Sequence, residues 1–428
     1  MEKRVVITGM GIWSCLGTTL DEVRDSLYKG KSGIVFNAER KSLGFRSALC
    51  ADVPKPDLKP FIPRNQRQFM PEEAQYAYMA TRQALEGAKL DADYMEHHEV
   101  GLIYGNDSVA EATMHALDKF REFHDTAACG SGAIFQSMNS TVTMNLACLF
   151  RLKGINLTAS AACASGSQSI GLAALLIRNG LQECVVCGGA QEANLYSVAA
   201  FDGIQSFSVR EDHPTCASRP FDRDRDGLVP GGGAATVVLE SYEHAVRRGA
   251  PIWGEIVGWG FSGNGDHIST PNIEGPVRSL EACLRNSGVT PKEIGYINAI
   301  QPESYTNMNA LEFINDEYAS WDITYYMNGN LLNRLPLVKK LKWREVFCFR
   351  GLWGHLTDKN NPAKSGSEGL FCFPACTYEM GRAPYMEASA GIENIFNFLR
   401  IDYVWRLNYR NHPDIQKSGI RMTMALSF

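Results

Sequence analysis

The 428-residue sequence lacks several features that define whole classes of protein. It has no run of 18 or more apolar residues and therefore no transmembrane helix. Residues 1–4 are polar apart from the initial methionine and lead straight into a strand pattern, so no secretory signal peptide is indicated. The formal net charge of -5 gives no sign of nucleic-acid binding. We therefore expect a cytoplasmic protein that binds no nucleic acid and whose 12 cysteines are reduced thiols.

The sequence also lacks complete motifs for metal or nucleotide binding. Cys184 and Cys187 have the C-x-x-C spacing, but they lie in an apolar run without a second ligand pair, which favours a buried strand over a redox or metal site. Gly9-Met10-Gly11 follows a strand pattern at residues 4–8 and is predicted to form a turn. The G-x-G-x-x-G pattern fails there because its last position is Ser14. We expect no cofactor and no metal.

One cysteine stands among small residues between an apolar stretch and a helical one. Residues 158–166 are T-A-S-A-A-C-A-S-G. Ile155 and Leu157 fit a short buried strand, and the helical pattern after the cysteine ends at Asn179-Gly180, a C-cap signal. Cys163 is thus predicted at a strand-to-helix corner, where unpaired backbone N–H groups favour a thiolate and can bind an oxyanion. A nucleophile and a small buried cysteine in a tight turn both fit this local pattern.

The first 299 residues alternate between strand and helix patterns. Interleaved Asp and Arg at residues 222–226 indicate a surface charge network or an ordered loop, and the arginines argue against calcium. Three glycines at 231–233 imply close approach of the backbone to another element or a ligand. The alternation predicts a layered α/β domain. Besides the segments already given, the predicted strands are residues 100–104, 184–188, 236–239, 252–259 and 294–299, and the predicted helices are residues 19–30, 72–90, 138–152, 242–248 and 275–286.

Several segments occur together in the order of one family. They are V-V-I-T-G-M-G-I at residues 5–12, S-A-A-C-A-S-G around Cys163, C-G-G-A-Q-E at 187–192, A-A-F-D at 199–202, S-R-P-F-D-R-D-R-D-G-L-V-P-G-G-G-A at 218–234 and H-A-x-x-R-G-A at 244–250. Residues 3–299 therefore resemble a β-ketoacyl-acyl carrier protein synthase, a condensing enzyme with a thiolase-like layered αβαβα fold.

The resemblance implies a decarboxylative Claisen condensation. Cys163 would be the catalytic residue that takes an acyl group from a pantetheine thioester, after which a malonyl thioester loses carbon dioxide and its carbanion attacks the acyl-enzyme. The implied partner is an acyl carrier protein with pantetheine-linked acyl chains, in fatty-acid or polyketide synthesis. The resemblance also implies a homodimer in which a strand near the nucleophile pairs across the two-fold axis.

The resemblance fails where the decarboxylation residues belong. The family uses two histidines and a lysine, and the first histidine should follow I-N-A at residues 297–299, where Ile300 stands instead. The family segments K-x-x-T-G-H and G-F-G-G-T-N are missing. Gly354-His355 lies in an aromatic strand pattern without the lysine or threonine. We therefore expect the second half of the fold to be truncated, with an unpaired sheet edge and an uncovered core face, and condensation to be impaired.

Residues 300–428 follow a different pattern. They hold almost half of the aromatic residues and alternate apolar with polar positions, as in Ile401, Tyr403 and Trp405. Strands are predicted near residues 321–329, 343–353, 385–392, 401–410 and 420–428, and the last residue is Phe428. This series resembles the last strands of a bacterial outer-membrane β-barrel protein, although about five strands are fewer than the roughly eight of a small barrel. An ordinary antiparallel sheet is the alternative.

The sequence thus predicts three segments. Residues 1–250 form a thiolase-like N-terminal half with the nucleophile, 251–299 begin a C-terminal half, and 300–428 form a β-rich tail of unrelated origin joined near Ala299-Ile300. The predicted function is that of a β-ketoacyl synthase-like acyltransferase with impaired condensation. One alternative is an outer-membrane fragment fused to an inactive synthase head, and only then would a membrane be a partner. The other is a cysteine-dependent acyl hydrolase, which needs a histidine near Cys163 that the sequence does not identify.

Overall fold

The structure is a computed structural model in which the chain forms two compact units. Unit 1 comprises Met1–Ser218 and Asp226–Pro291, and unit 2 comprises Arg219–Arg225 and Lys292–Phe428. The predicted junction at Ala299-Ile300, nearly all of the predicted strand 294–299 and the terminal Phe428 lie outside the described residues. The described residues are 2–219, 222, 225–266, 272–290, 293–294, 317–327, 332–334, 338–341, 343–355, 358, 364, 379–395, 399–412, 415 and 417–424.

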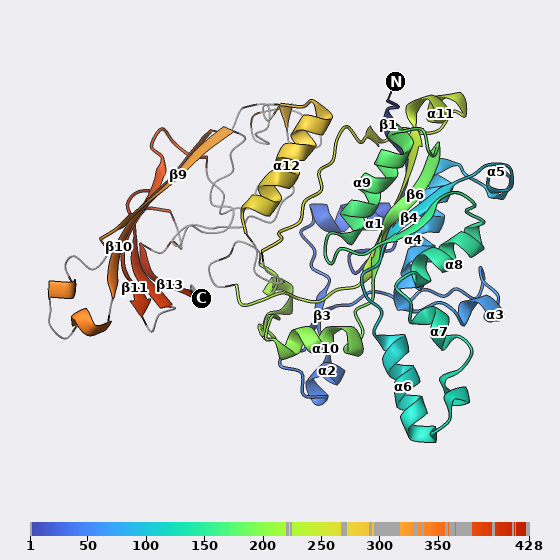
Figure 1. Ribbon diagram of the computed structural model, residues 1–428, viewed down its shortest axis with the longest axis horizontal. Helices are drawn as coiled ribbons and strands as arrows, with labels where there is room; N and C mark the ends of the chain where they lie inside the picture. The colour runs from blue at the N-terminus through green and yellow to red at the C-terminus, as the bar shows by residue number, and fades with distance from the viewer. Residues whose placement is uncertain are drawn as a thin grey trace. The chain divides into compact units, whose positions relative to one another are not determined.

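Unit 1 is a layered α/β domain around a six-stranded mixed sheet (Figure 1). The strand order is β5-β4-β6-β7-β1-β8, with β4 parallel to β5 and β6, and β7 antiparallel to β6 and β1. Its elements are β1 (Val5–Trp13), α1 (Leu20–Tyr28), β2 (Ile34–Phe36), α2 (Ala38–Ser42), β3 (Leu49–Ala51), α3 (Arg64–Arg67), α4 (Glu72–Ala88), α5 (Ala92–His97), β4 (Gly101–Gly105), α6 (Glu111–Phe123), η1 (Thr126–Cys129), α7 (Ala133–Gln136), α8 (Thr141–Phe150), β5 (Asn156–Ala159), α9 (Ser165–Arg178), β6 (Cys184–Gln191), α10 (Leu195–Gly203), η2 (Pro214–Cys216), β7 (Gly233–Ser241), α11 (Tyr242–Arg247), β8 (Gly254–Glu255) and α12 (Glu274–Ser287).

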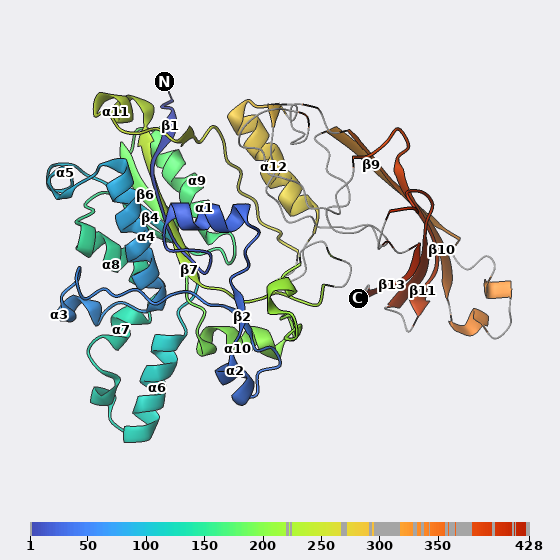
Figure 2. The ribbon, with the colours of Figure 1, turned by 180° about the vertical axis from the view of Figure 1, so that it is seen from behind.

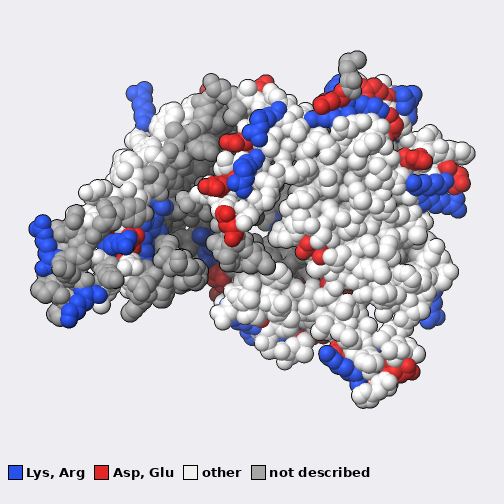
Figure 3. Space-filling model, in the orientation of Figure 1, with Lys and Arg blue, Asp and Glu red and all other residues white. Residues whose placement is uncertain are grey.

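Each face of this sheet has its own apolar core. Successive strand residues point to opposite faces, so Leu102 and Tyr104 of β4 pack with α4 and α8, whereas Ile103 packs with Ile177 of α9 on the other face. Figures 1 and 2 show unit 1 from opposite directions, with α9 on one side of the sheet and α4 on the other. The surface over α9 carries few charged side chains (Figure 3), in keeping with a helix whose only charged residue is Arg178. The predicted layered α/β domain is confirmed.

Two of the predicted local elements are wrong. Gly9 and Gly11 lie inside β1 rather than in a turn. A Cβ atom would lie 2.1 Å from a carbonyl oxygen of α4 on Gly9 and 2.0 Å from one on Gly11, so close packing explains both glycines. Glycine there lets the strand lie directly against the helix. The strand predicted at 252–259 is reduced to β8, since only Gly254 and Glu255 pair with β1. Beyond β8 the chain leaves the sheet, and Gly258 and Gly260 pack closely against α12.

The close approach predicted for the three glycines is confirmed. A Cβ atom on Gly232 would lie 2.9 Å from the carbonyl oxygen of Gln191, and one on Gly233 would lie 2.6 Å from that of Trp13. Gly233 also has a φ of +130°, which favours glycine. The neighbours are the backbone at the ends of β1 and β6, so these glycines let β7 enter the sheet between those two strands.

Unit 2 contains a five-stranded antiparallel sheet with the sequential order β13-β12-β11-β10-β9. An observed strand overlaps each of the five predicted ones, so the β-rich tail is confirmed as an antiparallel sheet. Among the residues that the structure describes, no helix is both long and apolar enough to cross a membrane. The elements are β9 (Glu317–Tyr326), η4 (Leu332–Arg334), η5 (Val338–Leu341), β10 (Arg344–His355), β11 (Tyr385–Ile395), β12 (Leu399–Arg406) and β13 (Ser418–Met424).

The sheet of unit 2 exposes apolar residues on one face and buries charged residues on the other. Pairing across the strands places the apolar residues together, because directly paired residues share a face. We term them the aromatic face; their exposed fractions range from 36% to 65%, and they are Ile323, Tyr325, Phe347, Phe349, Tyr403, Trp405 and Ile420. On the opposite face Glu387, Asp402 and Arg406 are at most 1% exposed. Arg400 and Arg421 both donate hydrogen bonds to the Asp402 carboxylate.

Candidate active site

Cys163 lies in the corner between the end of β5 at Ala159 and the start of α9 at Ser165. This position confirms the predicted strand-to-helix corner. The side chain is exposed, so the alternative of a small buried cysteine is wrong. The prediction that the preceding strand is buried is also wrong, because β5 is an edge strand and Leu157 is 49% exposed. The partial positive charge at the N-terminus of the 14-residue α9 favours an anion beside the thiol.

Two side chains hold this corner in an unusual conformation. Ala162 has a φ of +48°, in the left-handed region that costs a non-glycine residue roughly 1–2 kcal/mol. The Ala162 N–H group donates to Oδ1 of Asp107 at 3.0 Å, and the Ser160 hydroxyl donates to the same oxygen at 2.6 Å. The Ser165 hydroxyl accepts from the Ala161 N–H at 2.8 Å and donates to the Ala162 carbonyl at 2.7 Å. These bonds stabilise the turn that presents Cys163.

Glycines set the position of α9 against the sheet. A Cβ atom on Gly105, at the end of β4, would lie 2.5 Å from the backbone carbon of Ser165. A Cβ atom on Gly189 in β6 would lie 3.1 Å from the Cα of Gly166. The first turn of α9 therefore rests directly on the two parallel strands β4 and β6. This packing places Cys163 near the carboxyl ends of β4 and β5.

The pair Cys184 and Cys187 is unsuited to redox or metal chemistry. Both side chains lie in β6 and are at most 1% exposed. Burial raises the pKa of both thiols, which disfavours the reactive thiolate. The predicted buried strand is confirmed.

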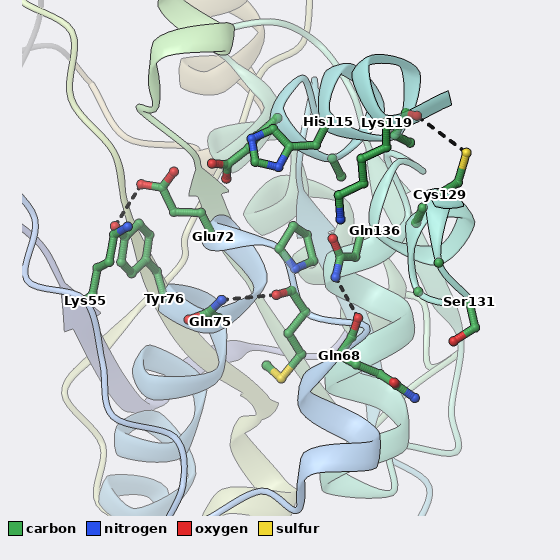
Figure 4. A pocket seen from close by; sticks show the side chains of 18 of the residues that line it. Lys55, Gln68, Glu72, Gln75, Tyr76, His115, Lys119, Cys129, Ser131 and Gln136 are labelled. Carbon is green, nitrogen blue, oxygen red and sulfur yellow. Dashed lines mark hydrogen bonds between the residues drawn. The ribbon is translucent and has the colours of Figure 1, made fainter. Parts of the chain in front are cut away.

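A polar cavity of about 560 Å³ lies in unit 1, between α4, α6 and α7 (Figure 4). Glu72, Tyr76, His115 and Lys119 are among the residues that line it, and Cys163 lies outside its lining. The Tyr76 hydroxyl donates to Glu72 at 2.8 Å, and the side chains of His115 and Lys119 lie on the wall opposite Gln75 (Figure 4). No motif in the sequence predicted this cavity.

Acidic side chains cluster beside this cavity. Carboxylate oxygens of Glu72, Glu111 and Glu192 lie within 4.8 Å of one another, and these residues could hold a cation. Asn194 already donates to Glu72 at 3.1 Å and to Glu192 at 2.8 Å, so part of their hydrogen-bonding capacity is used. The neighbouring Glu73 side chain is fully buried, and burial is the main cause that raises its pKa to about 8.

The sequence predicts Cys163 as the nucleophile, but it does not point to Asp107 or Ser165, whose side chains bond to the turn before it. Ser165 belongs to the small-residue motif around the cysteine, so its position close to the corner was visible. Asp107 follows a predicted strand far earlier in the chain. Its proximity to Cys163 depends on the pairing of β4 with β5, which the sequence alone did not establish.

Comparisons with known proteins agree with this fold. Residues 2–245 match the family described as Beta-ketoacyl synthase, N-terminal domain. The 3-oxoacyl-(acyl-carrier-protein) synthase 1 of Haemophilus influenzae is 37% identical over 299 residues, covering 69% of this chain and 72% of that protein. The corresponding synthase 2 of Vibrio cholerae is 34% identical over 308 residues, covering 70% and 73%. The crystal structure of a beta-ketoacyl synthase from Burkholderia phymatum has a TM-score of 0.66 and 35% identity, and the match covers 69% of this chain and 73% of that one.

The fold and these matches define a thiolase-like α/β protein over about 69% of the chain, as the sequence predicted. The remaining part is a separate antiparallel sheet. The chain belongs to the β-ketoacyl synthase family.

Proposed function

We propose that this protein is a β-ketoacyl synthase-like acyltransferase in which Cys163 accepts an acyl group from an acyl carrier protein. The observation that carries the proposal is the exposed Cys163 thiol at the N-terminus of α9, in a turn held by Asp107 and Ser165. A nucleophile must be accessible and held in place: the thiol is exposed, and the hydrogen bonds of Asp107 and Ser165 hold the turn that carries it. The names of the relatives from Haemophilus and Vibrio support an acyl carrier protein as the donor.

The acyl transfer needs little beyond this corner. The Cys163 thiolate attacks the carbonyl carbon of a pantetheine thioester, and backbone N–H groups at the start of α9 stabilise the negative oxygen that forms. The bond between the carbonyl carbon and the pantetheine sulfur then breaks. Pantetheine leaves as a thiolate that takes up a proton, and the acyl group remains on Cys163.

We propose further that condensation with a malonyl thioester is impaired. That step needs groups that stabilise the charge formed on decarboxylation, and the sequence lacks the histidine motifs and the lysine motif of the family. His355, in the G-H dipeptide, is exposed at the end of β10 in unit 2. We therefore expect the reaction to stop after acylation.

Mass spectrometry of the full chain after incubation with an acyl carrier protein bearing a saturated acyl chain tests the first step. The expected result is one acyl group on Cys163, lost in Cys163→Ala and kept in Cys216→Ala, which removes another exposed thiol. An unmodified Cys163 would contradict acyl transfer. Release of free fatty acid at each turnover would favour the acyl hydrolase instead.

Addition of malonyl-loaded carrier protein to the acylated chain tests the second step. We expect a condensed product to form at least about 100-fold more slowly than with the Haemophilus influenzae relative as control. Condensation at a comparable rate would refute the impairment.

We also propose a homodimer that pairs through β5. This strand is the first in the sheet order, no strand among the described residues pairs with its outer edge, and Leu157 is 49% exposed. Light scattering on the protein eluted from a size-exclusion column is expected to give twice the mass of one chain. The Leu157→Asp variant is expected to elute as a monomer. Leu181→Asp, at another exposed leucine, is the control and should leave the dimer intact. A monomeric wild type would exclude the dimer.

We propose a second role for residues 300–428, as strands of outer-membrane origin whose aromatic face contacts lipid. The supporting observation is the sheet of unit 2, in which aromatic side chains are exposed while Asp402 and Arg406 are buried. The buried face is mixed, because Val346, Tyr385 and Val404 lie on it with these charged residues. The difference from a sheet packed on a core in water is the outer face, which would be polar there and is apolar here. Apolar residues on the outer face and polar residues on the inner face are typical of membrane-embedded strands.

Binding of the full chain to vesicles of phosphatidylethanolamine and phosphatidylglycerol tests this role. Tyr403→Lys and Trp405→Lys are expected to reduce binding, whereas Phe123→Lys, at an exposed aromatic residue of unit 1, should not. Equal binding by all variants, or recovery of the chain only in the cytosolic fraction of cells, would contradict this role.

A tryptic peptide of residues 293–334, detected in cells, would show that the synthase-like segment 1–299 and the β-rich segment 300–428 belong to one polypeptide.

A further inference from the structure

Asp107 connects the loop after β4 to the corner that carries Cys163. Its Oδ1 atom accepts one hydrogen bond from the Ser160 hydroxyl at 2.6 Å and another from the Ala162 N–H at 3.0 Å. These two donors lie on either side of Ala161, within the turn that precedes the cysteine. A single carboxylate oxygen therefore fixes both the start and the middle of that turn.

The backbone of Asp107 is itself held in place. The Asn139 side chain donates to the Asp107 carbonyl at 2.8 Å, and the Asn106 side chain donates to the Asn139 carbonyl at 2.9 Å. Asn106 is 1% exposed, and its backbone N–H group donates to the backbone carbonyl of Ala159 at 3.1 Å. The carboxylate thus projects from a segment that is bonded to its surroundings and is in a position to hold a second segment.

The turn needs such a constraint because of its backbone conformation. Ala162 has a φ of +48°, which is unfavourable for a residue with a Cβ atom. A hydrogen bond from its N–H group to a charged oxygen offsets this cost. Without the carboxylate, the Ala162 peptide could rotate toward the right-handed region, and the direction of the next residue, Cys163, would change with it.

We propose that Asp107 is a positioning residue for Cys163, holding the Ala162 peptide so that the thiol stays presented at the start of α9. The proposal rests on the proposed function, in which Cys163 is the acyl acceptor. Asp107 acts through hydrogen bonds to the turn rather than on the reacting atoms. An amide oxygen can accept the same two bonds, whereas a methyl group cannot.

Alkylation by iodoacetamide, measured at each cysteine by mass spectrometry, tests this proposal. Cys148 and Cys216 are also exposed and serve as references within the same molecule. In Asp107→Ala the rate at Cys163 relative to Cys148 is expected to fall about tenfold, the scale of a lost hydrogen bond to a charged group. Asp107→Asn is expected to stay within about threefold of the wild type because the acceptor oxygen remains. Asp118→Ala, on the surface of α6, is the matched control and should change neither rate.

Three results would overturn the proposal. One is an unchanged ratio in Asp107→Ala, and another is an equal loss in Asp107→Asn and Asp107→Ala. The third is a parallel change at Cys163, Cys148 and Cys216, because a general loosening of unit 1 affects all exposed thiols. The test is independent of acyl transfer: a wild type that takes no acyl group would refute the proposed function, while the alkylation ratios would still decide the role of Asp107.

Discussion

Replacing Arg248 with methionine is expected to destabilise unit 1 by about 3–5 kcal/mol, because it leaves the carboxylate of Glu240 buried without its main partner. The Glu240 side chain is fully buried in β7. Arg248 donates from Nε to Oε2 of Glu240 at 2.8 Å, makes a second contact with Oε1, and donates to the carbonyl of Ala88 at 2.8 Å. The substitution removes all three bonds and retains most of the apolar volume.

The pKa of Glu240 shows how strongly the folded protein favours its charged form. Burial alone would raise this pKa, but hydrogen bonds from Arg248, His244 and Thr8 outweigh burial and lower it to about 2. Since an unfolded glutamate titrates near pH 4.5, this group adds stability that is fully present above that pH and is lost as the pH falls toward 2. The difference corresponds to about 3 kcal/mol. In the Arg248→Met variant we expect a smaller loss of stability on acidification, because the folded state no longer favours the charged form of Glu240 as strongly.

Urea unfolding at neutral and at acid pH tests the loss of stability and its dependence on pH. Unfolding is monitored by hydrogen exchange of the amides of residues 233–241, so that the signal comes from β7 alone. Arg247→Met, at the exposed last residue of α11 next to Arg248, is the control and should cost less than about 0.5 kcal/mol. The double variant Glu240→Gln with Arg248→Met should recover part of the loss, because no buried charge remains. A loss below about 1 kcal/mol in Arg248→Met, or an unchanged dependence on acid, would refute the reasoning.

Two further substitutions test other parts of unit 1. Burial raises the pKa of Glu73 to about 8, so between about pH 4.5 and 8 the unfolded chain releases a proton that the folded chain keeps, and stability falls as the pH rises. Relative to the wild type, Glu73→Gln should therefore gain roughly 2–4 kcal/mol in unfolding free energy between pH 5 and pH 8, with the exposed Glu39→Gln as control; an equal difference at both pH values would contradict this. Gly188→Ala should cost at least about 2 kcal/mol in urea unfolding, because its Cβ would lie 2.1 Å from the carbonyl oxygen of Ala235. Gly254→Ala, with no atom within 4 Å of the added Cβ, should cost less, and similar losses in the two variants would show that β6 adjusts.

The sequence predicted the corner at Cys163 because its signals are local. Small residues flank the cysteine, a strand pattern precedes it and a helical pattern with a C-cap follows it. The five strands of unit 2 were predictable for the same reason, since alternation within each segment defines a strand without reference to its neighbours. In the described parts of these segments, no contact with a distant element overrides the local pattern.

Features that depend on distant neighbours were missed or wrong. Gly9 and Gly11 look like a turn in isolation, and only the contact with α4 explains why they lie in a strand. Leu157 was expected to be buried because it is apolar, but the sheet order leaves β5 at an edge. The role of Asp107 depends on which strand pairs with β5. These cases need the order of the strands in space, which local patterns do not contain.

The position of β1 between two strands that come much later in the chain has a consequence for synthesis of the protein on the ribosome. The first strand of the chain lies between β7 and β8, so Val5 pairs with Ser241 and Val6 with Glu255. Trp13 at the end of β1 pairs with Ala234, so at roughly 5–20 residues per second about 220 residues must be added before β1 finds either neighbour, which takes about 10–50 seconds. During that time both edges of an apolar strand stay open on the nascent chain. Chaperones that bind extended apolar segments therefore have their longest opportunity at the N-terminus, and unit 1 can complete its fold only after β8 and α12 have also emerged.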